Sequence, residues 1–485
     1  MLDRLDSCLT GTSITRQMMA IEQCFTDALS PNHSVSTMHS EPRVAFIGLG
    51  AMGFGMAVHL VRSGFNVTGC DLDQRVLDLL IKTGGRASKS SREAVKDANV
   101  IIMMVVSAAQ IDSILFDAET GVAESLHAGT TLVICATVSP SYPVELQTRL
   151  ASTGVRVIDC PVSGGAAKAA SGSLKVFASG NDGVLEQEFT RSVLETMAEK
   201  VQVIPGGLGA STKIKLINQQ LAGIHIIAAA EVTALATLFG LNLRQLYRTV
   251  VDSDASSWMY ENRVPHIMDV DWTPKSALDI FVKDMGIVAT EGSLLACPIP
   301  LSSISQQLYL AASANGYGRE DDSGVVRFYL GQRTLRPSVE TAEVNDAAKT
   351  DAVLLVLHAI HLVAAAEAFA LCEKLELDDN LVHNSISDAA GSSRAFESYG
   401  ACLVRDRTGN FSFDTARGGL VSGRSSTRIA IGEFLTDQLS GRGHRCRQKT
   451  RSANVLGHGS TTIFAACKRK SRRRFRAHRV PPMRI

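Results

Sequence analysis

The clearest structural signal in this sequence is Arg43-Val-Ala-Phe-Ile-Gly48-Leu-Gly50-Ala-Met-Gly53. The residues before Gly48 have the length and apolar character of a short buried strand, and residues 50–62 have the composition of a helix. A G-x-G-x-x-G pattern therefore falls where a strand turns into a helix, and this context makes the pattern informative. Gly48 permits the tight turn, Gly50 lets the backbone approach a ligand, and Gly53 lets the helix pack closely on the sheet.

This turn predicts a binding site for the pyrophosphate of a dinucleotide. The free N–H groups and the dipole at the N-terminus of the helix attract the negative charge of the phosphates. The alternative is a glycine-rich turn without a ligand in another kind of α/β protein. The predicted cofactor-binding residues of the turn are Gly48, Leu49, Gly50, Ala51, Met52 and Gly53.

One carboxylate favours NAD over NADP as the cofactor. Asp71 ends the second apolar run, 21 residues after Gly50. In that position it would accept hydrogen bonds from the adenosine ribose and repel a 2′-phosphate. Asp73 and Arg75 lie close by and weaken the distinction, and an ordinary turn residue at the end of a strand is the alternative.

The rest of the chain divides into segments of different pattern. Strand-length apolar runs alternate with helical stretches and predict an α/β Rossmann domain, with a doubly wound, mostly parallel sheet, over residues 42–204. The predicted strands after the first are Val67–Asp71, Val100–Val106, Leu132–Cys135, Val155–Ile158 and Leu174–Ala178. Residues 211–239 contain no proline and one glycine, which predicts a long buried helix opening an all-α domain over residues 205–335.

The helical domain is partly repeated. His225-Ile-Ile-Ala-Ala-Ala-Glu231 recurs as His361-Leu-Val-Ala-Ala-Ala-Glu367, at an offset of 136 positions. The offset also holds for polar pairs further along, which alanine-rich helices alone would not produce. These pairs are Asp252/Asp388, Ser256/Ser392, Ser257/Ser393 and Glu261/Glu397. We therefore predict a partial, degenerate repeat of the all-α domain over residues 345–400.

Composition narrows the class of protein. The chain has 485 residues, 45% of them hydrophobic and 20% charged, with a net charge of +1. These values are typical of a globular protein without a general attraction to nucleic acid or acidic membranes. No uninterrupted apolar run reaches 18 residues, so we expect no membrane span. Ten scattered cysteines, with no C-x-x-C pair, indicate reduced thiols, no metal site and a cytoplasmic location.

The two ends of the chain have no pattern of a folded domain. We expect residues 1–41 to be a disordered extension, whose acidic residues argue against an import signal. Residues 401–485 form an irregular basic tail that includes Cys467-Lys-Arg-Lys-Ser-Arg-Arg-Arg-Phe-Arg476. This run resembles a nuclear localisation or nucleic-acid patch. Because the repeat loses its pattern abruptly, we favour a gene-model error instead.

Four further motifs point to one family. They are Asp159-Cys-Pro-Val-Ser-Gly-Gly165, Lys215-Leu-Ile-Asn218-Gln219, Phe281-Val-Lys283-Asp284, and Thr137 after an apolar strand. Together they resemble the β-hydroxyacid dehydrogenases, or 3-hydroxyisobutyrate dehydrogenase-like family, over about residues 43–335. Within this family, the sequence of residues 161–173 is most similar to the L-threonate dehydrogenase branch. Ala136 departs from the family, which usually has serine there.

The resemblance implies NAD(P)-dependent oxidation of a small hydroxy acid. Lys215 would be the general acid/base, with its pKa lowered from about 10.4 by burial and by a second cation, Lys283. Asn218, three residues on and on nearly the same helix face, would hold a substrate hydroxyl. Substrate binding would fall to Ser163, Gly164, Gly165 and Asn218, with Lys215, Asn218 and Ser163 as the catalytic set; Thr137 and Lys283 would contact the cofactor.

Other functions stay open at this point. Within the family, the substrate would be a four-carbon sugar acid resembling L-threonate, 3-hydroxyisobutyrate or tartronate semialdehyde, and a homo-oligomer remains open. A different reading is a non-catalytic, nucleotide-binding or chromatin-associated module, supported only by the basic tail. Lys215 argues against it, because the family member of that kind lacks the lysine.

The repeat carries no second site. Asp351, Leu354 and Leu355 stand where the first copy has Lys215, Asn218 and Gln219. We therefore interpret the second copy as a packing element. In the family that the chain resembles, the helical domain commonly packs against a partner subunit, so the resemblance implies that the second copy fills that place.

Overall fold

The computed structural model describes residues 42–181, 183–331 and 346–407. The predictions for residues 1–41 and for the basic run ending at Arg476 lie outside these ranges.

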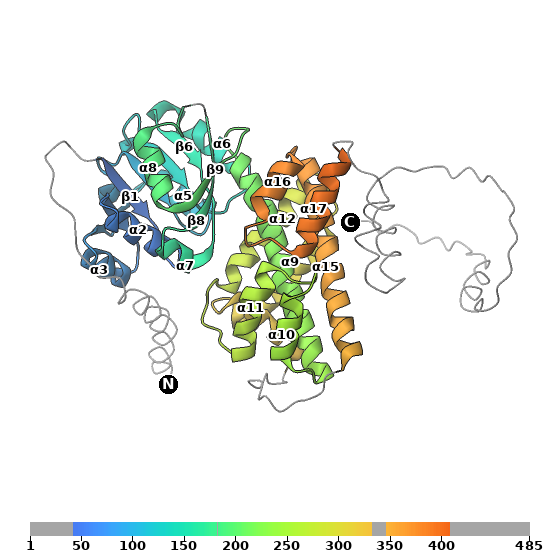
Figure 1. Ribbon diagram of the computed structural model, residues 1–485. Helices are drawn as coiled ribbons and strands as arrows, with labels where there is room; N and C mark the ends of the chain where they lie inside the picture. Colours follow the sequence, from blue (N-terminus) through green and yellow to red (C-terminus); the bar gives the residue numbers. More distant parts are fainter. Residues whose placement is uncertain (1–41, 182, 332–345, 408–485) are drawn as a thin grey trace, which may run out of the picture. The chain divides into compact units, whose positions relative to one another are not determined.

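A mostly parallel sheet forms the first part of the chain, as predicted (Figure 1). Its strands lie in the order β3-β2-β1-β4-β5-β6-β8-β7, and β9 pairs with β8. The strands from β3 to β6 are parallel, whereas β8 is antiparallel to β6 and β7. The bounds are β1 Arg43–Ile47, β2 Asn66–Cys70, β3 Arg86–Ser88, β4 Val100–Met103, β5 Thr131–Ile134, β6 Arg156–Asp159, β7 Val162–Ser163, β8 Leu174–Gly180 and β9 Ala198–Val203.

Helices cover both faces of this sheet. Along β1, Val44 and Phe46 belong to one apolar cluster and Ala45 and Ile47 to another, so alternate side chains are buried on opposite faces. A strand buried on both sides reads as a continuous apolar run, which explains why β1 was recognisable. The helices are α2 Gly53–Arg62, α3 Gln74–Lys82, α4 Ser91–Val95, α5 Ala108–Phe116, α6 Tyr142–Arg149, α7 Gly165–Ala170 and α8 Glu188–Thr196.

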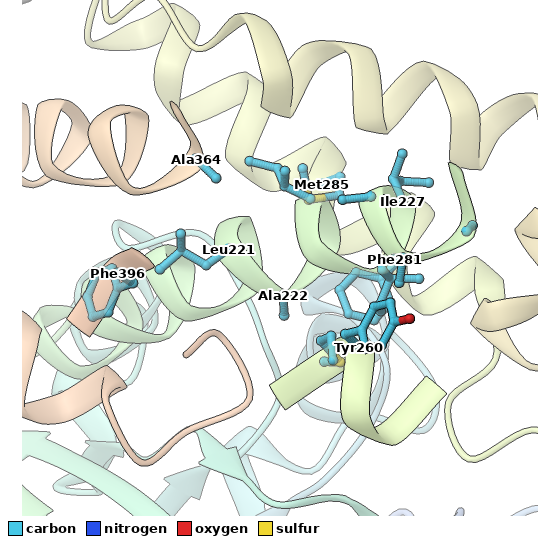
Figure 2. Packing of buried hydrophobic residues seen from close by; sticks show 14 of the residues in the cluster. Leu221, Ala222, Ile227, Tyr260, Phe281, Met285, Ala364 and Phe396 are labelled. Carbon is cyan, nitrogen blue, oxygen red and sulfur yellow. The ribbon is translucent and has the colours of Figure 1, made fainter. Parts of the chain in front are cut away.

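The second part is helical and is built around α9 (Ala210–Phe239). Its residues Leu221, Ala222 and Ile227 pack among side chains from several other helices (Figure 2). Gly223 is the one glycine of α9, and a Cβ there would collide with the sulfur of Met285, so the glycine permits a close helix crossing. The other helices are α10 Leu243–Val251, α11 Trp258–Asp269, α12 Leu278–Leu294, α13 Pro300–Ala312 and α14 Val326–Leu330.

Three more helices follow in the order of α9, α10 and α11. They are α15 Ala347–Lys374, α16 Asp379–Ile386 and α17 Arg394–Arg407, and α15 packs against α9 (Figure 1). Residues related by the offset of 136 contact each other. The rings of His225 and His361 lie 4.4 Å apart between centroids, and Ser257 forms an antiparallel bridge with Ser393. Both groups of helices share one apolar core.

Two of these helices, α9 and α15, are long and apolar enough to cross a membrane by length and composition alone. Polar residues interrupt the apolar sequence of both helices, so neither contains an uninterrupted apolar run of 18 residues. In the most apolar window of α9, 78% of the residues are buried inside the protein, as in the core helix of a folded domain; for α15 the share is 50%.

Candidate active site

The glycine turn lies between β1 and α2. Gly48 has a φ of +93°, and a Cβ there would lie 2.5 Å from the carbonyl oxygen of Met104. A Cβ at Gly53 would collide with the carbonyl oxygen of Gly48, which closes the turn. Beside Gly50 the space is open. The turn therefore has the shape that a pyrophosphate at the N-terminus of α2 requires, although α2 begins at Gly53 rather than at Gly50.

Asp71 supports this turn directly. One carboxylate oxygen accepts a hydrogen bond from the N–H of Leu49 at 2.7 Å, and the other accepts from the N–H of Asp73 at 2.9 Å. Arg75 binds the carboxylate of Asp73 at 2.6 Å, which holds the pKa of Asp73 below its usual range. The nearby cation is thus already paired with a carboxylate of this chain.

Lys215 is a buried amine in the first half of α9. Its side chain is 7% exposed, and among the residues that the structure describes its Nζ donates no hydrogen bond. Burial lowers the pKa of Lys215 to about 8; the charge of Asp284 opposes this shift, and that of Lys283 adds to it. A buried lysine that is partly neutral near physiological pH is equipped to exchange a proton.

A chain of hydrogen bonds and one ion pair runs from α9 through α12 to the carbonyl of Thr137, just after β5. Asn218 Nδ2 donates to Gln219 Oε1 at 3.0 Å, and Gln219 Nε2 donates to Asp284 Oδ2 at 2.5 Å. The other oxygen of Asp284 lies 2.8 Å from Lys283 Nζ, which donates to the carbonyl of Thr137 at 2.9 Å. These contacts bring together four residues expected at the site or next to it. Asp284 is buried and links two of them, Gln219 and Lys283.

The glycines after Ser163 have backbone conformations that favour glycine. Ser163 lies on β7 and is buried, while Gly164 and Gly165 have φ values of +138° and +77° and lead into α7. No hydrogen bond joins Ser163 to Lys215 among the described residues. Ala136 is buried and offers no side-chain donor, as expected from the sequence.

Asp159 attaches α9 to the sheet and was not singled out from the sequence. Its carboxylate accepts from the N–H of Thr212 at 2.8 Å and from the hydroxyl at 2.6 Å, close to the N-terminus of α9. Burial raises the pKa of Asp159 to about 6, against the effect of these hydrogen bonds. Because Asp159 ends β6 and starts the segment that leads to Ser163, it holds that segment beside the turn of α9 that precedes Lys215.

One more contact at the candidate site comes from residues 346–407, the segment predicted to be a second copy. The N–H of Gly391 donates to Asn218 Oδ1 at 3.0 Å. Nothing in the local sequence around either residue predicts it, since they lie 173 positions apart.

Two families match the chain over its first two parts. Residues 43–206 match the NAD binding domain of 6-phosphogluconate dehydrogenase. Residues 209–329 match the family described as NAD-binding of NADP-dependent 3-hydroxyisobutyrate dehydrogenase. The second match ends before α15.

Relatives cover the same region. An L-threonate dehydrogenase of Cupriavidus necator is 43% identical over 288 residues, which are 59% of this chain and 96% of the relative. That of Escherichia coli K12 is 41% identical over 293 residues, 60% of this chain and 96% of the relative. A crystal structure of 3-hydroxyisobutyrate dehydrogenase from Salmonella typhimurium is 39% identical, with a TM-score of 0.56, over 59% of this chain and all of that one.

The glycine turn, the lysine-bearing helix and these matches lead to one assignment. The chain belongs to the β-hydroxyacid, or 3-hydroxyisobutyrate dehydrogenase-like, family and is an NAD(P)-dependent oxidoreductase that acts on a small hydroxy acid.

Proposed function

We propose that this enzyme oxidises L-threonate, or a closely similar four-carbon sugar acid, with NAD as the cofactor. The observation that carries the proposal is Lys215, a buried amine with a pKa of about 8 and no hydrogen-bond partner among the described residues. The choice of substrate is supported by relatives at 41–43% identity that are named L-threonate dehydrogenases.

Oxidation of an alcohol needs a base for the hydroxyl proton and a hydride acceptor. Unprotonated Lys215 Nζ takes the hydroxyl proton, and in the reverse reaction protonated Lys215 returns it to the carbonyl oxygen. A nicotinamide cofactor bound at the glycine turn would supply the hydride acceptor. Lys283, fixed on the carbonyl of Thr137, places a positive charge near Lys215 and favours its neutral form.

The remaining site residues hold the substrate. Ser163 and the N–H groups of Gly164 and Gly165 donate hydrogen bonds to the carboxylate, because glycines let an anion approach the backbone closely. The amide of Asn218 holds a hydroxyl of the substrate. Residues 48–53 would hold the pyrophosphate of the cofactor, and Asp71 would favour NAD over NADP.

The proposal also concerns the location of the enzyme in the cell and its oligomeric state. We infer a cytoplasmic enzyme with a small hydroxy acid as its substrate. A homo-oligomer is compatible with the proposal and is not required by it, because the residues with proposed roles all belong to one chain.

The test is NADH production by the full-length enzyme on L-threonate, 3-hydroxyisobutyrate and L-serine, and the reverse reaction on tartronate semialdehyde. We expect Lys215→Met and Lys215→Ala to lose on the order of 10²–10⁴ in kcat, the usual share of a general acid/base. NAD affinity should stay within twofold or so, because the glycine turn is a separate element.

Lys82→Met is the matched control, since Lys82 is an exposed lysine in the last turn of α3. It should keep wild-type turnover. Near wild-type turnover in both Lys215 variants would remove the mechanism, and a higher kcat/KM on another acid of the panel would replace L-threonate as the substrate.

A further inference from the structure

The side-chain amide of Asn218 is held in one orientation by a residue outside the first helical copy. Asn218 is completely buried, and the N–H of Gly391 donates to its Oδ1 at 3.0 Å. An N–H group can pair only with the oxygen of an amide, so this contact decides which end of the side chain points to Gly391. The nitrogen end is then directed to Gln219 Oε1. Asn218 keeps one lone pair and one N–H for a substrate hydroxyl.

Glycine is needed for this approach. A Cβ on residue 391 would lie 2.7 Å from the backbone oxygen of Asn218 and 3.1 Å from the Cβ of Leu221, so the loop lies directly on α9. In the first copy the equivalent position, 136 residues earlier, holds Ala255. The second copy therefore has glycine, and the first copy alanine, at the position whose N–H in the second copy contacts Asn218.

The same loop is attached to the sheet beside Ser163. Lys175 pairs with Ser163 in the β7–β8 ladder, and its Nζ donates to the carbonyl of Ser385 at 2.7 Å and forms an ion pair with Asp388. Gln202 on β9 donates to the hydroxyl of Ser385 at 2.7 Å. Residues 385–391 thus contact both the strand next to the proposed carboxylate-binding serine and the amide proposed to hold the hydroxyl.

We propose that residues 385–391 of the second copy form a wall of the substrate site, and that Gly391 is a positioning residue that orients Asn218. The proposal rests on the proposed function, in which Asn218 holds a substrate hydroxyl. It changes the role of the second copy from packing alone to a part of the site. The ligand class concerned is a hydroxy acid with a hydroxyl in reach of Asn218.

The decisive variant is Gly391→Ala in the full-length protein, measured for KM, kcat and NAD affinity. The added Cβ must push the loop off Asn218 and break the hydrogen bond. We expect KM for the sugar acid to rise up to about tenfold, the equivalent of one neutral hydrogen bond. We expect kcat to fall less and NAD affinity to be unchanged.

Gly400→Ala is the matched control. A Cβ on residue 400 crowds His383 and the Phe369 ring inside the second copy, at 2.5–2.9 Å, and its three nearest neighbours all lie outside α9. If Gly391→Ala acted only by loosening the second copy, Gly400→Ala would raise KM equally, and the proposal would be overturned.

A double-mutant cycle with Asn218→Ala separates positioning from structure. If Gly391 acts through Asn218, the double variant should have the KM of Asn218→Ala alone, because the orienting contact has nothing left to orient. Additive effects would overturn the proposal. If Asn218→Ala itself left KM unchanged, the role of Asn218 in the proposed function would fail, which is a different result.

Asp388→Ala serves if Gly391→Ala does not fold. The Asp388 side chain is largely exposed, so its loss should leave the fold intact while releasing the loop from Lys175. We expect KM to rise and the effect to disappear in the Asn218→Ala background. An unchanged KM in a folded Asp388→Ala enzyme would contradict the proposal that residues 385–391 form a wall of the substrate site.

Discussion

The pKa of Lys215 is set by burial and by the charges of two neighbouring side chains. Burial and Lys283 lower the pKa, Asp284 raises it, and the result is a pKa of about 8. Oxidation requires the unprotonated amine, so kcat/KM for oxidation should rise with pH and level off above about 8. Asp284→Asn removes a negative charge and should move the inflection to lower pH, while its amide oxygen can still accept from Gln219.

The measurement is kcat/KM against pH for wild type, Asp284→Asn and the control Asp279→Asn on the exposed side of the same helix. A flat profile between pH 6 and 9, or an inflection that moves upward in Asp284→Asn, would contradict this account of Lys215.

Asp71 gives a second prediction for a single residue. NAD should bind more tightly than NADP, because the Asp71 carboxylate lies at the turn and repels a 2′-phosphate, while Arg75 is paired with Asp73. Asp71→Asn should reduce the difference in affinity between NAD and NADP, because the variant no longer repels the 2′-phosphate of NADP. Fluorescence titration of both cofactors tests this, and tighter binding of NADP by the wild type would show the assignment of Asp71 to be wrong.

Residues in short motifs were predictable, and residues joined by the fold were not. Lys215, Asn218 and Ser163 each stand in a recognisable segment. Asp284 had no role assigned from the sequence, since its contact with Gln219 spans 65 positions and depends on how α9 and α12 pack. Asp159 was visible in its motif, but its role at the start of α9 depends on the position of that helix.

At the level of elements, α9 and α15 meet through a buried pair of histidines. The ring nitrogens of His225 make no hydrogen bond within the described residues. Burial lowers the pKa of His225 to about 3 and that of His361 well below its usual value, although a contact with the backbone of Ala255 opposes the shift of His361. Both are neutral in the folded protein. Because the unfolded chain binds protons below about pH 6.5, their contribution to stability is complete above that pH and is lost as the pH falls toward 3.

We therefore predict that the Tm falls between pH 6.5 and pH 4, by about 2–4 °C for each kcal/mol lost. The double variant His225→Leu/His361→Leu should flatten this dependence and keep or raise the Tm at pH 7, since it removes buried polar atoms without partners. Calorimetry across this pH range is the measurement. A double variant with the same pH dependence as wild type would show that the pair is not responsible.

Elements were predictable where their burial is uniform. The strand expected at residues 100–106 ends at Met103, because the chain turns toward the glycine turn at that point. β3, β7 and β9 were missed: β3 and β9 have few buried side chains and no apolar pattern, and β7 is only two residues long. The long helix expected from residue 211 begins one residue earlier. The doubly wound architecture itself is confirmed.

At the scale of the whole molecule, the second copy covers a face of α9 that would otherwise meet water. Residues of α15 and α17 belong to the same apolar core as α9. A chain that ends after Gly331 should therefore expose that face and form larger assemblies than the full-length chain does under the same conditions. Light scattering on both forms decides it. A monomeric, stable short form would show that α15 is dispensable for covering α9.

The link between the two copies has a consequence for how the enzyme behaves on dilution. Two helical units that met only by diffusion would separate as the protein concentration fell, and a site completed by both would be lost with them. Here the contact between Gly391 and Asn218 is made within one chain, so its effective local concentration is set by the connecting segment and not by the amount of enzyme. Specific activity should then be constant from micromolar to picomolar enzyme. One chain with two helical units carries one site, whereas a dimer of two identical subunits with one helical unit each would carry two.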